Sequence, residues 1–146
     1  MPERTVLQSM SQRHVLSLGP TANVHGAACA MTRANCGSVL IIDTASTMLG
    51  ILTERDVMIR VVAKGLDPTK TLVSTVMTAA PDSVRPETRV ADAVLVMIER
   101  GFRHLPVVAA NGALLGVFAV RDAMPREVDT AYGLSEFYEQ VNDALG

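Results

Sequence analysis

The most restrictive feature of the sequence is a repeat, because residues 17–58 align with residues 83–124 at a constant spacing of 66 residues without a gap. SLGPTANVHGAACAM matches SVRPETRVADAVLVM, and MLGILTERDVM matches LLGVFAVRDAM. The identical pairs are Ser17/Ser83, Pro20/Pro86, Val24/Val90, Ala27/Ala93, Met31/Met97, Leu49/Leu115, Gly50/Gly116, Arg55/Arg121, Asp56/Asp122 and Met58/Met124. A unit of about 60 residues is marginally stable alone. The repeat therefore predicts two similar units that bury their apolar sheet faces against each other.

Both copies show the same order of predicted elements. Helical spacing of apolar residues, and apolar or β-branched runs of strand length, indicate where they lie. The expected elements are helices over 23–34 and 89–100, and strands over 38–42, 48–52, 104–108 and 114–120. A further helix is predicted over 54–64, with Val57, Val61 and Val62 on one face. Each unit thus reads strand-helix-strand-strand-helix, a mixed α/β (α+β) fold.

The repeat and its punctuation predict the domain boundaries. A short echo precedes each copy, VLQSMS from Val6 and VSTVMT from Val73. We expect a first domain over 6–68 and a second over 72–125. Phe137, Val141 and Leu145 follow each other at four-residue spacing, which predicts an amphipathic final helix over 130–146 that packs on the body or on a second subunit.

Composition and charge exclude several classes of function. Hydrophobic residues make up 49% of the chain and charged residues 19%, so it can bury a core. The formal net charge is only -2 and is evenly spread, which argues against a general nucleic-acid surface. No apolar run has the length of a membrane span, and the first residues lack the build of a secretory signal. A cytoplasmic protein without a metal site is expected.

The segment GILTERD, from Gly50, lies where a strand passes into a helix. Helix N-termini offer free N–H groups to phosphate, and the Asp56 carboxylate can accept both hydroxyls of a ribose. Thr53 followed by Asp56 also matches a capping box, which needs no ligand. The second copy, GVFAVRD, keeps Arg121 and Asp122 but has Ala119 in place of the hydroxyl. Capping alone does not predict that Arg-Asp appears twice.

These residues resemble a tandem pair of cystathionine-β-synthase (CBS) domains, often called a Bateman module. The resemblance is carried by GILTERD and GVFAVRD, by RHLPVV from Arg103, by VMT from Val76, and by the junction DPTKTLVSTVMT. It covers nearly everything from Val6 to Met124. It implies two β-α-β-β-α units related by a pseudo-twofold axis, usually paired into a disc-shaped homodimer. The clefts of such modules bind adenosine derivatives: AMP, ADP, ATP, S-adenosylmethionine or NAD.

The resemblance also implies which residues would bind the ligand. In the first cleft, Thr53 and Asp56 would bind the ribose. The other expected contacts are Ala80, Pro81 and Asp82 beside the base, and Arg103, His104 and Arg121 at the phosphate. In the second cleft, Asp122 would bind the ribose, His14 and Leu16 would border the base, and Arg55 would be the main cation. Gly37 and Ser38 stand where the other copy has Arg103 and His104. The second cleft is therefore expected to be weaker or empty.

A regulatory module is the function that these features favour. No nucleophile-base pair, HExxH or phosphate-binding loop pattern occurs in the sequence, so we expect no enzyme and no catalytic residue. No cofactor is expected beyond the regulatory nucleotide. The protein would change the shape of its dimer on binding a nucleotide, and an unknown effector protein would read that change. The alternative is a nucleotide-blind oligomerisation or protein-interaction module in which Asp56 only caps its helix.

Overall fold

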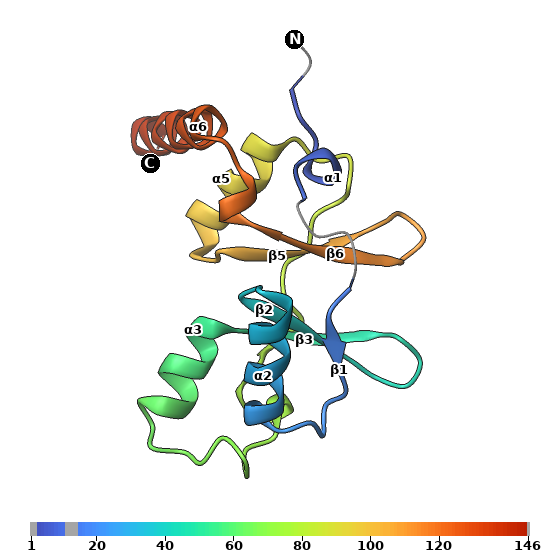
Figure 1. Ribbon diagram of the computed structural model, residues 1–146. Helices are drawn as coiled ribbons and strands as arrows, with labels where there is room; N and C mark the ends of the chain where they lie inside the picture. Colours follow the sequence, from blue (N-terminus) through green and yellow to red (C-terminus); the bar gives the residue numbers. More distant parts are fainter. Residues whose placement is uncertain (1–2, 11–14, 146) are drawn as a thin grey trace. The chain divides into compact units, whose positions relative to one another are not determined.

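The computed structural model describes residues 3–10 and 15–145, and it divides into two compact units (Figure 1). The first, called the 14–82 unit here, lies within residues 14–82. The second, called the 83–146 unit, combines residues 83–146 with residues 1–13. Each unit contains one copy of the repeat, so the prediction of two similar mixed α/β units is confirmed.

A four-stranded sheet forms the centre of the 14–82 unit, in the order β1-β2-β3-β4. Its strands are β1 (Ser17–Leu18), β2 (Ser38–Ile42), β3 (Met48–Thr53) and β4 (Thr78–Ala79). Its helices are α2 (Val24–Ala34), α3 (Glu54–Asp56), the π-helix η1 (Val57–Val62) and α4 (Val73–Val76). β1 pairs in parallel with β2, and the other neighbours are antiparallel. The predicted helix and hairpin of this copy are confirmed to within one residue.

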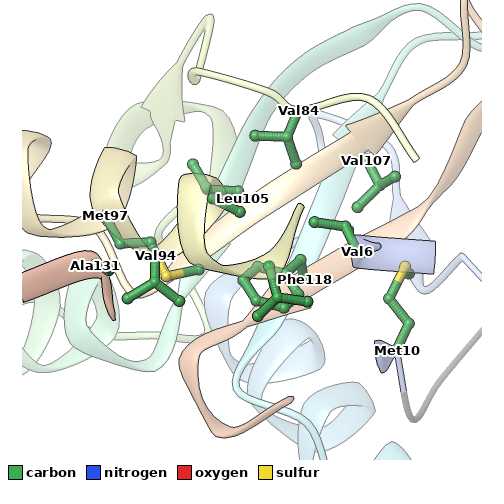
Figure 2. Packing of buried hydrophobic residues seen from close by; sticks show 11 residues of the cluster. Val6, Met10, Val84, Val94, Met97, Leu105, Val107, Phe118 and Ala131 are labelled. Atoms are coloured by element: carbon green, nitrogen blue, oxygen red, sulfur yellow. The ribbon is translucent and has the colours of Figure 1, made fainter. Parts of the chain in front are cut away.

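The 83–146 unit contains the corresponding hairpin of β5 (His104–Val108) and β6 (Leu114–Ala119). Its helices are α1 (Val6–Ser9), α5 (Val90–Arg100), the 3-10 turn η2 (Val120–Asp122) and α6 (Pro125–Leu145). Phe118 and Leu105 are completely buried in its core, between side chains of α5 and α1 (Figure 2). The alternation of buried positions along β6 follows from the two-residue period of a strand.

The first strand of the second copy is reduced to one bridge, and a proline accounts for the difference. In the 14–82 unit, the N–H of Leu40 donates to the carbonyl of Leu16 at 3.0 Å. The residue 66 positions later is Pro106, which has no N–H to donate. Only Val84 therefore pairs, in parallel with Val107.

The prediction of a separate last helix over 130–146 was wrong at its start. α6 runs without a break from Pro125 to Leu145, so it combines the last predicted helix of the repeat with the predicted terminal helix. Pro125 disfavours a helical conformation for the residue before it, and Ala123 is already extended with ψ 145°. η2 therefore ends at Asp122, and α6 begins at the proline, where a missing N–H costs nothing.

The helix predicted over 54–64 also differs from the structure. It is α-helical only over Glu54–Asp56 and then widens into the π-helix η1, where the N–H of Ala63 bonds the carbonyl of Met58 five residues back. Val61 is buried, but Val62 is 69% exposed, so placing Val62 on the core face was wrong. One step along a helix turns the side chain by about 100°, which takes Val62 out of the core.

The two short helices that echo each other each complete the unit of the other copy. α1 precedes the first copy, yet it packs in the core of the 83–146 unit through Val6 and Met10. α4 precedes the second copy, yet Val73 and Val76 lie in the core of the 14–82 unit. The packing units therefore differ from the predicted domains over 6–68 and 72–125, which followed the order of the sequence.

A partly buried ion pair ties residue 4 to the start of α6. Arg4 Nη2 donates to Glu127 Oε1 at 2.6 Å, Arg4 Nε donates to Oε2 at 3.2 Å, and Glu127 also accepts from the N–H of Met124. The hydrogen bond from Arg4 is the main cause that lowers the pKa of Glu127, against the opposing effect of burial. The equivalent residue of the first copy is the buried Val61, so the two units solve one packing position differently.

This ion pair predicts a pH dependence of stability. Since the pKa of Glu127 is lower in the folded state, its contribution is complete above the unfolded value of about 4.3 and is lost as the pH falls through the folded value. Glu127→Gln should therefore be less stable than the parent at pH 7, and the difference should shrink below about pH 4. Urea unfolding at several pH values measures this. A difference that stays constant down to pH 2 would contradict it.

No described helix is both long enough and apolar enough to cross a membrane.

Candidate functional site

The strand β3 leads to the candidate site, and β4 lies against it at a glycine. Gly50 pairs with Ala79, and a Cβ at Gly50 would lie 2.6 Å from both the carbonyl oxygen of Thr78 and the sulfur of Met77. A strand glycine thus permits the close approach of β4. The pairing holds the start of the segment that continues into Ala80.

Gly50→Ala is therefore expected to destabilise the protein by about 1 to 3 kcal/mol, because the backbone of β4 must move to admit the methyl group. Gly133→Ala is the control. No heavy atom lies within 4 Å of the added methyl group in α6, and alanine favours a helix by about 0.5 to 1 kcal/mol over glycine. Urea unfolding of both variants checks the opposite signs. A neutral Gly50→Ala would show that β4 is not held in this position.

Thr53 and Asp56 form a closed pair where β3 ends and α3 begins. The Asp56 carboxylate accepts at Oδ2 from the N–H of Thr53 at 3.0 Å and from its hydroxyl at 3.1 Å. The N–H of Asp56 donates to the Thr53 hydroxyl at 3.2 Å. The predicted capping box is confirmed. Asp56 is only 8% exposed, and its second oxygen, Oδ1, takes no part in the box.

Arg60, which the sequence reasoning missed, lies beside Oδ1. Its Nε is 3.7 Å from Asp56 Oδ1, and its Nη1 donates to the carbonyls of Val76 and Met77 at 3.2 and 2.9 Å. An arginine four residues after an aspartate on a helix is a recognisable ion-pair spacing. Arg126 stands 66 residues later, so the repeat carried a second signal for this residue.

The three residues expected beside the base follow β4 directly. Ala80 is exposed and adopts a left-handed backbone, with φ 45°, while its N–H donates to the carbonyl of Leu49 at 3.2 Å. Such a conformation is uncommon for a residue with a side chain, and it turns the chain away from the sheet edge. Pro81 and Asp82 are half-buried. All three belong to the same packing unit as Asp56.

The second copy keeps half of this arrangement. The N–H of Ala119 donates to Asp122 Oδ2 at 3.0 Å, as that of Thr53 does to Asp56. The hydroxyl is missing, and Asp122 is half-buried where Asp56 is buried. Asp122 therefore still caps a backbone N–H, which weakens the sequence argument that capping cannot explain both copies.

The remaining predicted residues are distributed over both units. Arg55 is exposed and Leu16 is half-buried in the 14–82 unit. Arg103 and Arg121 are exposed, and His104 is half-buried, in the 83–146 unit. His14 lies outside the described residues. The structure thus brings together Thr53 and Asp56, and it places the 80–82 segment after the strand that pairs with β3. Among the described residues, no cluster of three or more His, Cys, Asp or Glu side chains suits a metal ion.

Two β-α-β-β-α repeats, each with an aspartate that caps the end of its hairpin, define a class of tandem-repeat modules. The family model of the CBS domain matches residues 7–63 and 73–127, so the chain belongs to the CBS domain family. The two matches lie close to the predicted domains over 6–68 and 72–125. The recognition made from the repeat and its motifs is confirmed.

Individual relatives and solved structures agree with this family. An uncharacterized protein of Methanopyrus kandleri is 32% identical over 136 residues, which cover 93% of this chain and 69% of that protein. A CBS-domain containing protein from Agrobacterium tumefaciens has 28% identity and a TM-score of 0.73, over 81% of this chain and 94% of its own. A CBS domain protein from Pyrobaculum aerophilum, complexed with AMP, has 24% identity and a TM-score of 0.76, over 86% and 95%. The last shows the shared fold alone.

Proposed function

We propose that the protein is a regulatory module that binds an adenosine nucleotide, with Asp56 as the acceptor of the ribose hydroxyls. The observation that carries the proposal is the state of the Asp56 carboxylate. It is buried, and the capping box fixes Oδ2 while leaving Oδ1 outside. A cap alone uses one oxygen, whereas a ribose diol needs a carboxylate whose second oxygen is also directed.

The chemistry of the ligand follows from the neighbours of this carboxylate. A related fold has been solved in complex with AMP, which supports an adenine nucleotide as the first ligand to test. ADP, ATP, S-adenosylmethionine and NAD share the same adenosine part and would use the same ribose contact. The roles of Ala80, Pro81 and Asp82 at the base, and of Arg103, His104 and Arg121 at the phosphate, stay predictions. So do those of Asp122, Arg55, Leu16 and His14 at a second, weaker site.

The rival function is a nucleotide-blind interaction module, and one observation favours it. The Thr53–Asp56 box is complete without any ligand, and the second copy keeps the carboxylate half of it. In that case both aspartates would be conformational residues only. The two functions differ in whether adenosine compounds bind the folded protein.

A thermal-shift screen with adenosine, AMP, ADP, ATP, S-adenosylmethionine and NAD separates the two functions. A ligand at about 100 times its Kd stabilises the folded state by about 2.7 kcal/mol, or roughly 5 to 10 °C for a chain of this size. Guanosine monophosphate is the control, since it offers the same ribose and phosphate with a different base. No shift with any adenosine compound would favour the interaction module.

We also propose that the module acts as a homodimer that an effector protein reads, without catalysis of its own. Apolar side chains of η1, Met58, Ile59 and Val62, are exposed, and large exposed apolar surfaces usually mark interfaces. A second copy of the chain is the occupant we propose for this face. Light scattering should give twice 15.6 kDa, and Val62→Glu should lower the mass toward 15.6 kDa. A monomeric parent would contradict the dimer.

A further inference from the structure

The guanidinium of Arg60 joins two parts of the 14–82 unit that the sequence keeps apart. One end, Nη1, donates to the carbonyls of Val76 and Met77, at the end of α4. The other side, Nε, lies 3.7 Å from Oδ1 of Asp56. Two carbonyl acceptors fix the plane of the guanidinium, so the direction that Nε presents to the carboxylate is also fixed.

The Asp56 carboxylate is consequently held from both ends. Oδ2 accepts two hydrogen bonds from Thr53, and Oδ1 faces the cation of Arg60. A carboxylate with only the first anchor could still rotate about the bond to its Cβ. The second anchor opposes that rotation, and a group held in its binding orientation loses less entropy when a ligand arrives.

We propose that Arg60 is a positioning residue of the ribose site: it aligns Oδ1 of Asp56 with the ribose and links this carboxylate to the segment before Ala80. This inference rests on the proposed function. Met77 is followed at once by β4 and then by Ala80, so a contact to the Met77 carbonyl reaches the segment expected to border the base. The ribose carboxylate and that segment would then keep one relative position.

The second copy supplies a matched control. Arg126 occupies the equivalent position, 66 residues later, and is exposed on the first turn of α6. There, a different arginine makes the comparable backbone contact, since Arg4 Nη2 donates to the carbonyl of Asp122 at 3.1 Å. Arg126→Ala removes the same side chain without touching the Asp56 carboxylate.

The test compares AMP with 2′-deoxy-AMP, which lacks one of the two ribose hydroxyls. Titration calorimetry gives the Kd of both ligands for the parent, Arg60→Ala, Arg60→Lys and Arg126→Ala. The parent should prefer AMP by roughly tenfold or more, since one hydrogen bond to a charged acceptor is lost. Arg60→Ala should reduce this preference to about threefold or less, and Arg126→Ala should keep the value of the parent. Arg60→Lys should fall between, because an ammonium cannot hold both partners in one plane.

The ratio of the two Kd values separates positioning from stability, because a merely destabilised protein would bind both ligands more weakly in the same proportion. If Arg60→Ala keeps the preference of the parent, Arg60 only stabilises the fold and the inference is wrong. Should Arg60→Ala fail to fold, the ratio for Arg60→Lys decides in the same way. A parent that does not bind AMP would instead overturn the proposed function, whatever the variants do.

Discussion

Asp56→Ala is expected to weaken AMP binding by about 100-fold or more, because two hydrogen bonds to a charged acceptor contribute roughly 1.5 to 3 kcal/mol each. The loss of stability without ligand should be smaller. The substitution removes one side of the capping box, and a cap contributes about 1 kcal/mol. Calorimetric titration and urea unfolding of the same protein give both values.

Asp122→Ala is the matched control for this prediction. It removes the equivalent carboxylate from the copy without the hydroxyl, so the dominant AMP affinity should change little. Ala119→Thr should strengthen binding at that copy by about 1 kcal/mol, the value of one neutral hydrogen bond. If Asp56→Ala binds AMP as the parent does but unfolds at much lower urea, the aspartate is only a cap. A greater loss from Asp122→Ala would reverse the ranking of the two sites.

Val6→Asp and Val73→Asp should each destabilise the protein by more than about 3 kcal/mol, since each places an unpaired charge in a core. Both valines are completely buried, in the two short helices that echo each other. The informative result is where the damage appears. Hydrogen exchange should increase over 104–119 for Val6→Asp and over 38–53 for Val73→Asp, because the helices complete the opposite copies.

The milder pair Val6→Ala and Val73→Ala, at about 2 kcal/mol each, keeps the comparison possible if the charged variants do not fold. Leu7→Ala is a control on the same helix as Val6, because Leu7 is exposed. Its exchange pattern should match that of the parent. If Val6→Asp instead loosened 38–53, α1 would belong to the first copy, as the boundary at residue 6 implied.

The predicted helices and strands agree with the structure where local signals decide them. α2 has an asparagine cap whose side chain accepts from Gly26, and its apolar spacing matches the helical period. β2 and β5 have the predicted bounds because each is a short apolar run between turn residues. The repeat then doubles each signal, since a pattern seen twice at one spacing is harder to misread.

The errors fall where partners distant in sequence decide the outcome. Nothing local in VLQSMS says that Val6 packs under Phe118, because a four-residue helix can complete either unit. Pro106 and Pro125 were visible, yet their effects depend on which strand and helix lie beside them. At the candidate site, the Thr53–Asp56 pair was predictable from adjacent residues. The contact of Arg60 with the Met77 carbonyl needed the fold.

The placement of α1 also determines the order in which parts of the chain can become buried during synthesis. The 14–82 unit is one continuous stretch, so its core can close as soon as that stretch has emerged from the ribosome. Val6 and Met10 are made earlier, but their partners extend to Phe118 and Ala131. Contacts of such long sequence separation also slow folding. The first helix to be synthesised is therefore among the last to find its place, and it stays open to chaperones and proteases until the second hairpin forms.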